Sequence, residues 1–187
     1  MALLGRILKN RRAGESKMAW NLPNLAGDTV FEITSPDFTH ETTLDRRHAS
    51  KRAGGEDLSP ALAWTGLPEA AQLLLVVEDP DAPSGAPFVH CVALLDPDVK
   101  ELPRGALASG TVTTGVRILR SGWGRGYMGP APIVGHGPHR YVFQLFALTE
   151  PLESAGGKPL ESAKPAQVLA AAKAHARGRL DGFYERQ

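Results

Sequence analysis

The chain has few of the features that are typical of disulfide-bonded, membrane-spanning or secreted proteins. It holds a single cysteine, Cys91, so no disulfide can form within it, and a lone thiol is typical of a reducing compartment. Its apolar runs fall well short of the ~20 residues of a membrane-spanning helix. The first twenty residues scatter charges among few apolar side chains, unlike a secretory signal. We therefore expect a cytoplasmic protein with no stable membrane insertion.

Positive and negative side chains are nearly balanced. Lys and Arg number 21 against 20 Asp and Glu, so no overall field attracts nucleic acid and we expect no such partner. We expect a loosely ordered basic arm over residues 1–25 and a single domain over residues 26–187. If residues 2–9 were helical, their apolar side chains would share one face, as in a membrane-surface or partner-docking helix. So short a helix is marginal alone, which favours the loose arm.

Turn-forming residues are abundant, with 20 Gly and 15 Pro between short apolar runs, as in a β-rich fold with shaped loops. We expect strands at residues 29–33, 73–78, 88–95, 112–119 and 141–148. The runs 88–95 and 141–148 are apolar on both parities, which predicts strands in the middle of a layered β structure. One clear helix is predicted, over residues 166–174, with Gly178 as its cap.

Two loops place polar residues beside these strands: EDPDAPSGAPFVHC at 78–91 and SGWGRGYMGPAPIVGHGPHRYVF at 121–143. Alternate residues of an extended chain share a side, so His139 and Tyr141 should point together. Each loop delivers a histidine, His90 or His139, to the end of a buried strand. With Asp79 nearby in sequence, the two loops predict a binding site.

Other chemistries fit these loops less well. Residues 124–129 read GxGxxG, but Pro130 and Pro132 follow at once, so no helix begins there and a dinucleotide loop is excluded. His90, on the face of Val92, should lie opposite Cys91, which argues against a Cys–His nucleophilic pair. No serine stands in a G-x-S-x-G elbow.

Metal binding and paired-carboxylate catalysis are harder to set aside. His136, His139, His90 and Asp79 could supply ligands, but their spacing matches no recognised metal motif, so we expect no metal. Asp79 and Asp81 could work as an acid/base pair. The prolines around them favour a tight turn in which Asp81 bonds to its own loop.

Taken in order, these segments resemble the phosphatidylethanolamine-binding protein family, which includes the Raf kinase inhibitor proteins. The similarity is greatest to its bacterial and archaeal branch. The family's motifs are D-P-D-A-P-[ST] with a nearby W-x-H, G-[ED]-[ND]-[IL]-S-P-x-L-x-W, and a glycine-rich segment that ends in H-R-Y-x-F. The chain carries DPDAPS, GEDLSPALAW at 55–64, GHGPHRYVF and a C-terminal LDGFYER. The resemblance covers roughly residues 27 to 187.

The resemblance implies a mainly β fold: a β-sandwich of two antiparallel sheets with a C-terminal α-helix. It also implies a small anion pocket and a cis peptide bond before Pro83. Transferred position by position, the ligand-binding residues are Asp79, Asp81, Pro83, Phe88, His90, Ala131, Pro132, His139 and Tyr141. Two positions depart from the family pattern: Phe88 replaces a tryptophan, and Ile133 replaces the second proline of a P-P pair.

From this resemblance we expect a binding protein rather than an enzyme, with no cofactor. His90, His139 and the N–H groups of residues 135–137 would hold a small anion, such as phosphate or a phosphoethanolamine-like headgroup, and Tyr141 would donate a further hydrogen bond. Two alternatives stay open: a kinase or protease regulator that recognises an unidentified protein partner, and a hydrolase built on the Asp/His cluster. Homodimer formation is an expectation from bacterial relatives.

Overall fold

The computed structural model describes residues 2–186. Its helices are α1 (Ala2–Leu8) and α2 (Pro165–Ala171), and its 3-10 turns are η1 (Glu15–Lys17), η2 (Ala19–Asn21), η3 (Pro23–Leu25), η4 (Arg46–His48) and η5 (Lys51–Ala53). Its strands are β1 (Thr29–Val30), β2 (Glu32–Thr34), β3 (Thr42–Thr43), β4 (Leu62–Thr65), β5 (Gln72–Asp79), β6 (Phe88–Leu95), β7 (Glu101–Leu102), β8 (Val116–Ile118), β9 (His139–Leu148), β10 (Ser154–Ala155), β11 (Lys158–Pro159) and β12 (Ala174–Tyr184). The fold is mainly β, as predicted.

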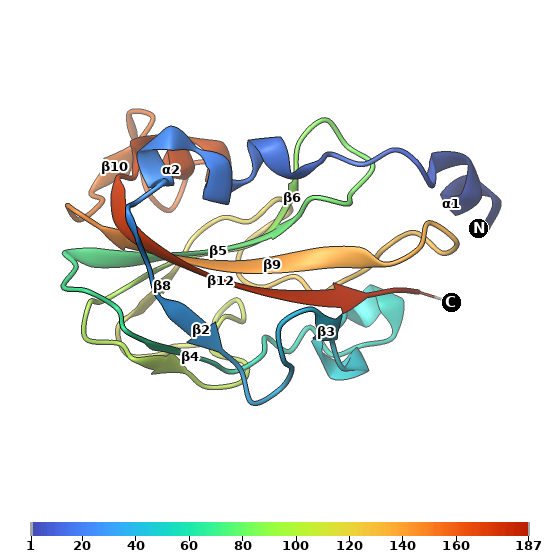
Figure 1. The fold of residues 1–187 in the computed structure, drawn as a ribbon, viewed down its shortest axis with the longest axis horizontal. Coiled ribbons are helices and arrows are strands. Elements are labelled where there is room, and N and C mark those ends of the chain that lie inside the picture. Colours follow the sequence, from blue (N-terminus) through green and yellow to red (C-terminus); the bar gives the residue numbers. More distant parts are fainter. Residues whose placement is uncertain (1, 187) are drawn as a thin grey trace.

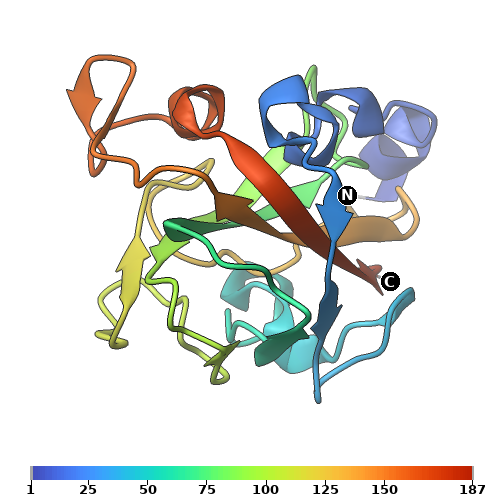
Figure 2. The same cartoon turned by 60° about the vertical axis from the view of Figure 1, so that its left-hand side comes forward.

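One large sheet organises the molecule, in the order β1-β12-β9-β5-β6-β8, with β3 also paired to β12. Its central pairs are antiparallel, whereas the short strands β1 and β3 pair with β12 in parallel. A three-stranded antiparallel sheet, β2-β4-β7, lies across one face of the large sheet (Figures 1 and 2). Helix α2 and the N-terminal 3-10 turns cover the opposite face (Figure 1).

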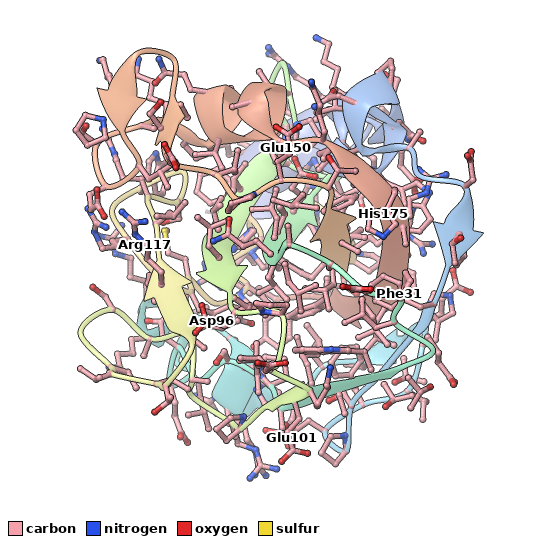
Figure 3. The ribbon with its side chains drawn as sticks, turned by 90° about the vertical axis from the view of Figure 1, so that its left-hand side faces the viewer. Phe31, Asp96, Glu101, Arg117, Glu150 and His175 are labelled. Carbon is pink, nitrogen blue, oxygen red and sulfur yellow. The ribbon has the colours of Figure 1, made fainter. Side chains whose placement is uncertain are left out.

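Each face of the large sheet packs a core of its own. Between the two sheets lie Phe31, Val77, Phe143 and Leu145, with side chains from β4 and β7 (Figure 3, where Phe31 and Glu101 mark this side). Under α2 and the N-terminal turns, the large sheet contributes the alternate residues of the same strands. Burial on both faces explains why β5, β6 and β9 read as unbroken apolar runs.

The strand predictions succeed best for these buried strands. The range 88–95 is β6, and the range 141–148 lies within β9, which begins two residues earlier. The expected strand at 29–33 is divided into β1 and β2, and of 112–119 only β8 is a strand. The shorter edge strands carry fewer buried side chains, so their boundaries leave little mark in the sequence.

The C-terminal region differs from the prediction. Helix α2 ends at Ala171, and the chain then forms the eleven-residue strand β12, so the helix is followed by a strand. Gly178 is therefore not a helix cap. A Cβ on Gly178 would lie 2.7 Å from the ring of Phe31, so the glycine allows the core to pack closely against β12.

The N-terminal arm, expected to be loosely ordered, is held against the domain along its length, and its first residues form helix α1. Met18, Ala19 and Leu25 are fully buried, and Ala19 N donates to Glu78 Oε2 at 2.8 Å. Further towards the N-terminus, Ala13 N and Gly14 N donate to the carbonyls of the 80–82 turn. Across residues 2–186, neither helix has the length and apolar character to cross a bilayer.

Candidate functional site

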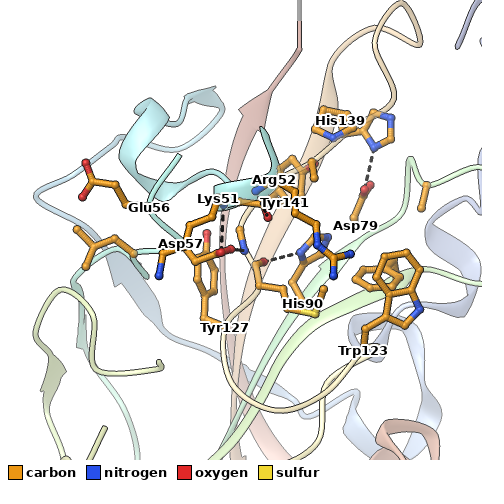
Figure 4. A pocket seen from close by; sticks show the side chains of 18 of the residues that line it. Lys51, Arg52, Glu56, Asp57, Asp79, His90, Trp123, Tyr127, His139 and Tyr141 are labelled. Atoms are coloured by element: carbon orange, nitrogen blue, oxygen red, sulfur yellow. Dashed lines mark hydrogen bonds and ion pairs between the residues drawn. The ribbon is translucent and has the colours of Figure 1, made fainter. Parts of the chain in front are cut away.

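A pocket of about 1100 Å³ opens where β5, β6 and β9 reach the end of the inter-sheet core (Figure 4). Eight of the nine expected residues line it: Asp79, Pro83, Phe88, His90, Ala131, Pro132, His139 and Tyr141. The two loop segments, 78–91 and 121–143, thus meet in space, because β5 pairs with both β6 and β9. The ninth residue, Asp81, does not line the pocket.

A β-bulge directs His90 into the pocket. In the β5–β6 ladder Val77 pairs with Cys91 and Glu78 pairs with Val89, so His90 is the extra residue. A bulge breaks the alternation of sides. His90 therefore faces the inter-sheet side together with Cys91, whereas Val92 packs on the other face. The expectation that His90 and Cys91 lie on opposite faces is wrong.

His90 is held by its backbone neighbour Met128. His90 Nδ1 donates to Met128 O at 2.6 Å, since a carbonyl can only accept. Its other ring nitrogen, Nε2, has no hydrogen-bond partner within residues 2–186. Burial lowers the pKa of His90, and the nearby Asp79 carboxylate opposes this only in part. At neutral pH the ring is therefore uncharged, with a lone pair on Nε2.

Asp79 and His139 form a buried pair on the adjacent wall. His139 Nδ1 lies 2.7 Å from Asp79 Oδ2, and Asp79 Oδ1 accepts from Asp81 N at 2.8 Å. His139 Nε2 lies 2.7 Å from His136 Nδ1. Both ring nitrogens of His139 are therefore engaged, so it lines the pocket without a free N–H for a ligand. Its expected role as an anion donor is not supported by this geometry.

Asp81 connects the N-terminal arm to β9. Asp81 Oδ2 accepts from Arg140 N at 2.7 Å, and Asp81 Oδ1 pairs with Arg12 Nη1 at 2.7 Å. The turn itself differs from the expectation. No peptide bond of residues 2–186 is cis, so the bond before Pro83 is trans. Trans is the more stable X–Pro form, and here the Ala82 carbonyl accepts from Ala13 N at 2.9 Å.

The glycine loop at residues 135–137 faces the arm rather than the pocket. His136 is fully buried, and its Nε2 donates to Leu8 O at 2.9 Å and to Arg11 O at 3.2 Å. Arg12 Nη1 donates to Pro138 O at 3.3 Å. The N-terminal arm thus packs against the loop whose N–H groups were expected to help hold an anion.

Tyr141 contributes a ring and a hydroxyl to the floor of the pocket. Its ring meets the His90 ring edge-on, with 5.1 Å between centroids. Burial raises the pKa of Tyr141, and the Asp79 carboxylate adds to the effect. Tyr141 therefore stays a phenol and a hydrogen-bond donor. The expectation that His139 and Tyr141 point together is met, because both line the pocket.

Trp123, Lys51 and Arg52 are among the lining residues that were not anticipated as site residues. Trp123 is 68% exposed and packs edge-on against Phe88, 5.1 Å between centroids. The Trp123 indole therefore lies beside Phe88, the position at which the family usually has tryptophan. Lys51 and Arg52 line the opposite wall together with Glu56 and Asp57 (Figure 4). The sequence carried a weak signal for Trp123, which stands in the glycine-rich segment before β9.

The pocket offers no activated nucleophile. Cys91 is fully buried, and burial raises the pKa of its thiol to about 12. Neither His90 nor His139 is hydrogen-bonded to a serine, threonine or cysteine within residues 2–186. In the same part of the chain, no group of three or more His, Cys, Asp or Glu is placed to hold a metal ion.

Comparison with known proteins agrees with this architecture. A family model described as phosphatidylethanolamine-binding protein matches residues 34–185. A UPF0098 protein of Pyrococcus horikoshii is 34% identical over 181 residues, which cover 93% of this chain and 80% of the relative. A UPF0098 protein of Aquifex aeolicus is 33% identical over 166 residues, covering 86% of this chain and 92% of the relative.

Solved structures show the same similarity. The E. coli protein YbcL, described as a member of the mammalian PEBP family, aligns with a TM-score of 0.72 at 30% identity and covers 84% of this chain and 99% of its own. A PEBP homologue from Chlamydia trachomatis aligns with a TM-score of 0.69 at 27% identity, covering 86% of this chain and 100% of its own. The chain belongs to the phosphatidylethanolamine-binding protein family.

Proposed function

We propose that the pocket binds a small anion of the phosphate-monoester type, such as inorganic phosphate or a phosphoethanolamine-like headgroup. The observation that carries this proposal is the state of His90: its Nδ1 is fixed by Met128 O, and its Nε2 is left without a partner in the pocket. A fixed, buried imidazole with one free nitrogen is suited to one hydrogen bond with a ligand oxygen.

His90 can bind an anion in either of its two protonation states. The neutral ring accepts a hydrogen bond from a protonated phosphate oxygen, or it takes up a proton and donates to an ionised oxygen. Asp79 does not oppose this strongly, because each of its oxygens already accepts a hydrogen bond, from His139 and from Asp81 N. The phenol of Tyr141 supplies a second donor on the same wall.

The pocket is larger than a phosphate group requires. Next to His90 lie the rings of Phe88 and Trp123, and across the opening lie Lys51 and Arg52. An organic substituent of the ligand would pack on the aromatic side, whereas the charges of Lys51 and Arg52 are matched by Glu56 and Asp57 on the same wall. These features favour a phosphate ester over the free ion.

We infer that the protein acts by binding rather than by catalysis. The absence of a hydroxyl or thiol hydrogen-bonded to His90 or His139 within residues 2–186 supports this inference. A cytoplasmic location, a regulated protein partner and a second copy of the chain stay predictions.

The test is calorimetric titration with O-phosphoethanolamine. Replacing His90 with alanine removes a charge-assisted bond worth about 1.5–3 kcal/mol, so the affinity should fall roughly ten- to hundredfold. His175→Ala is the matched control, because this histidine lies on β12 and outside the pocket lining. Equal affinity in the His90 variant and the parent would refute the assignment. Hydrolysis of phosphoesters that disappears in His90→Ala would favour the hydrolase instead.

A further inference from the structure

Helix α1 is attached to the molecule through a glycine. A Cβ on Gly5 would lie 2.1 Å from Val134 O and 2.7 Å from His136 N, so this side of the helix backbone lies directly against the 134–136 loop. The end of the helix is fixed by the bond from His136 Nε2 to Leu8 O. Only a residue without a side chain allows this approach.

The attachment leaves the large apolar side chains of α1 in solvent. Leu3 is 71% exposed, Leu4 55% and Ile7 72%. At 3.6 residues per turn these three positions share one side of the helix, and Gly5 lies on the other. A helix that packs through glycine and presents its apolar side outward is the reverse of the usual surface helix.

Cations without an acidic partner within residues 2–186 lie on α1 at Arg6, directly after it at Lys9 and Arg11, and further along the arm at Lys17. Arg6, Lys9, Arg11 and Lys17 are exposed, and none forms an ion pair with a residue of the described range 2–186. The nearest acid along the chain, Glu15, already pairs with Arg179 and Arg140. The surface of α1 and its flank is therefore apolar and positively charged together.

We propose that α1 binds the surface of an anionic lipid bilayer, with Leu3, Leu4 and Ile7 in the interface and the neighbouring cations at the headgroups. Apolar side chains flanked by Lys and Arg match a bilayer interface in both polarity and charge. A second copy of the chain fits less well, because the two α1 surfaces would repel each other. A helix this short lies on the membrane and does not cross it.

The arrangement would bring the pocket to the membrane. Figure 1 shows α1 at the end of the molecule where β9 begins and β12 ends. The arm that follows α1 bonds to Ala82, which lines the pocket. Helix α1 itself lies against Val134, the residue next to the pocket-lining Ile133. The membrane contact is independent of the proposed anion binding, because no residue of α1 lines the pocket.

The test is co-sedimentation of the full chain with vesicles. Phosphatidylcholine vesicles containing phosphatidylglycerol should bind the protein, and vesicles of phosphatidylcholine alone should not. Added salt should weaken the binding, since it screens the cations. In the double variant Leu3→Gln, Ile7→Gln the partition coefficient onto the vesicles should fall by about tenfold or more, since two apolar side chains are removed from the interface. Arg6→Gln combined with Lys9→Gln should lower partitioning by about tenfold or more.

Two control variants separate this proposal from its alternatives. Val112 is 98% exposed but lies elsewhere in the chain, so Val112→Gln should leave vesicle binding unchanged. His90→Ala should also bind vesicles as the parent does, even where it loses O-phosphoethanolamine. Absence of binding to the anionic vesicles, or equal binding by the α1 variants, would overturn the proposal. Concentration-dependent dimers that the α1 variants abolish, without vesicle binding, would assign the surface to a second copy.

Discussion

His136 and His139 are joined by a hydrogen bond of 2.7 Å between Nδ1 of the first ring and Nε2 of the second, and both rings are buried. His136 continues the chain of bonds to the carbonyls of Leu8 and Arg11, and His139 continues it to Asp79. One line of hydrogen bonds therefore runs from the pocket wall to the end of α1. It connects segments more than a hundred residues apart.

The protons needed along this line can be counted. A carbonyl only accepts, so His136 Nε2 carries a proton. The His136–His139 bond and the His139–Asp79 bond each need one further proton. Two neutral imidazoles and a carboxylate supply only two protons. The complete line holds three, so the group of Asp79, His139 and His136 has no net charge, as its burial requires.

Replacing His136 with alanine should loosen the arm and leave anion binding in place. The arm loses the bond to Leu8 O, worth about 1 kcal/mol, so trypsin should cleave after Lys9 or Arg11 roughly fivefold faster. Binding of O-phosphoethanolamine should persist, because His90 is untouched. His175→Ala serves as the control. An unchanged cleavage rate in His136→Ala would show that the bond does not hold the arm.

Anion binding should be linked to the uptake of one proton. Sulfate offers only acceptors, so it requires the protonated form of His90, whose pKa burial has lowered in the free protein. Above that pKa the affinity for sulfate should fall about tenfold per pH unit, since each binding event must bring one proton. Calorimetry in buffers of different ionisation enthalpy would count the proton. His90→Gln should abolish the pH dependence, and a pH-independent affinity of the parent would contradict the mechanism.

Gly178→Ala should destabilise the protein through its core. The added Cβ would meet Phe31 at 2.7 Å and Ile33 at 2.8 Å, and overpacking of this kind costs about 1–3 kcal/mol of unfolding free energy. Gly85→Ala is the matched control, because nothing lies within 4 Å of its added Cβ and its backbone is not left-handed. Chemical denaturation of both variants measures the difference. Equal stability of both would mean that β12 can shift to admit the methyl group.

Strand β12 was not predicted because charged residues interrupt its apolar pattern. These residues are Arg177, Arg179 and Asp181. In the structure Arg179 pairs with Asp181 and Glu15, and Asp181 also pairs with Arg140. Apart from the local Arg179–Asp181 pair, the partners Glu15 and Arg140 are distant in sequence, so charges that are typical of a loop are satisfied inside a sheet. The buried strands β5, β6 and β9 were predictable because their burial on both faces shows in every residue.

The site was predictable in its members more than in its contacts. The motifs bring Asp79, His90 and Tyr141 to one pocket, as expected. The direction of His90 depends on a bulge, and period-two alternation cannot reveal an inserted residue. The engagement of His139 depends on His136 and on the arm, whose contact lies more than a hundred residues away. Long-range pairing of polar groups leaves no local signature.

Glu78 should make the folded protein less stable as the pH rises. Burial raises the pKa of Glu78 above its ordinary value of 4.5, against the hydrogen bonds from Gln144 and Ala19 N that favour the charged form. The folded state therefore holds this proton at pH values where the unfolded state has released it. The stabilisation is complete below pH 4.5 and is lost as the pH rises through the raised pKa, with a slope of up to about 1.4 kcal/mol per pH unit.

The variant Glu78→Gln isolates this contribution. A glutamine does not titrate, so the difference in unfolding free energy between variant and parent should grow in favour of the variant as the pH rises above 4.5. Urea denaturation at a series of pH values measures that difference, and the other titrating groups cancel in it. A difference that stays constant with pH would show that the carboxyl of Glu78 ionises as readily in the folded protein as in the unfolded chain. The bonds from Ala19 and Gln144 would then offset the effect of burial on the pKa of Glu78.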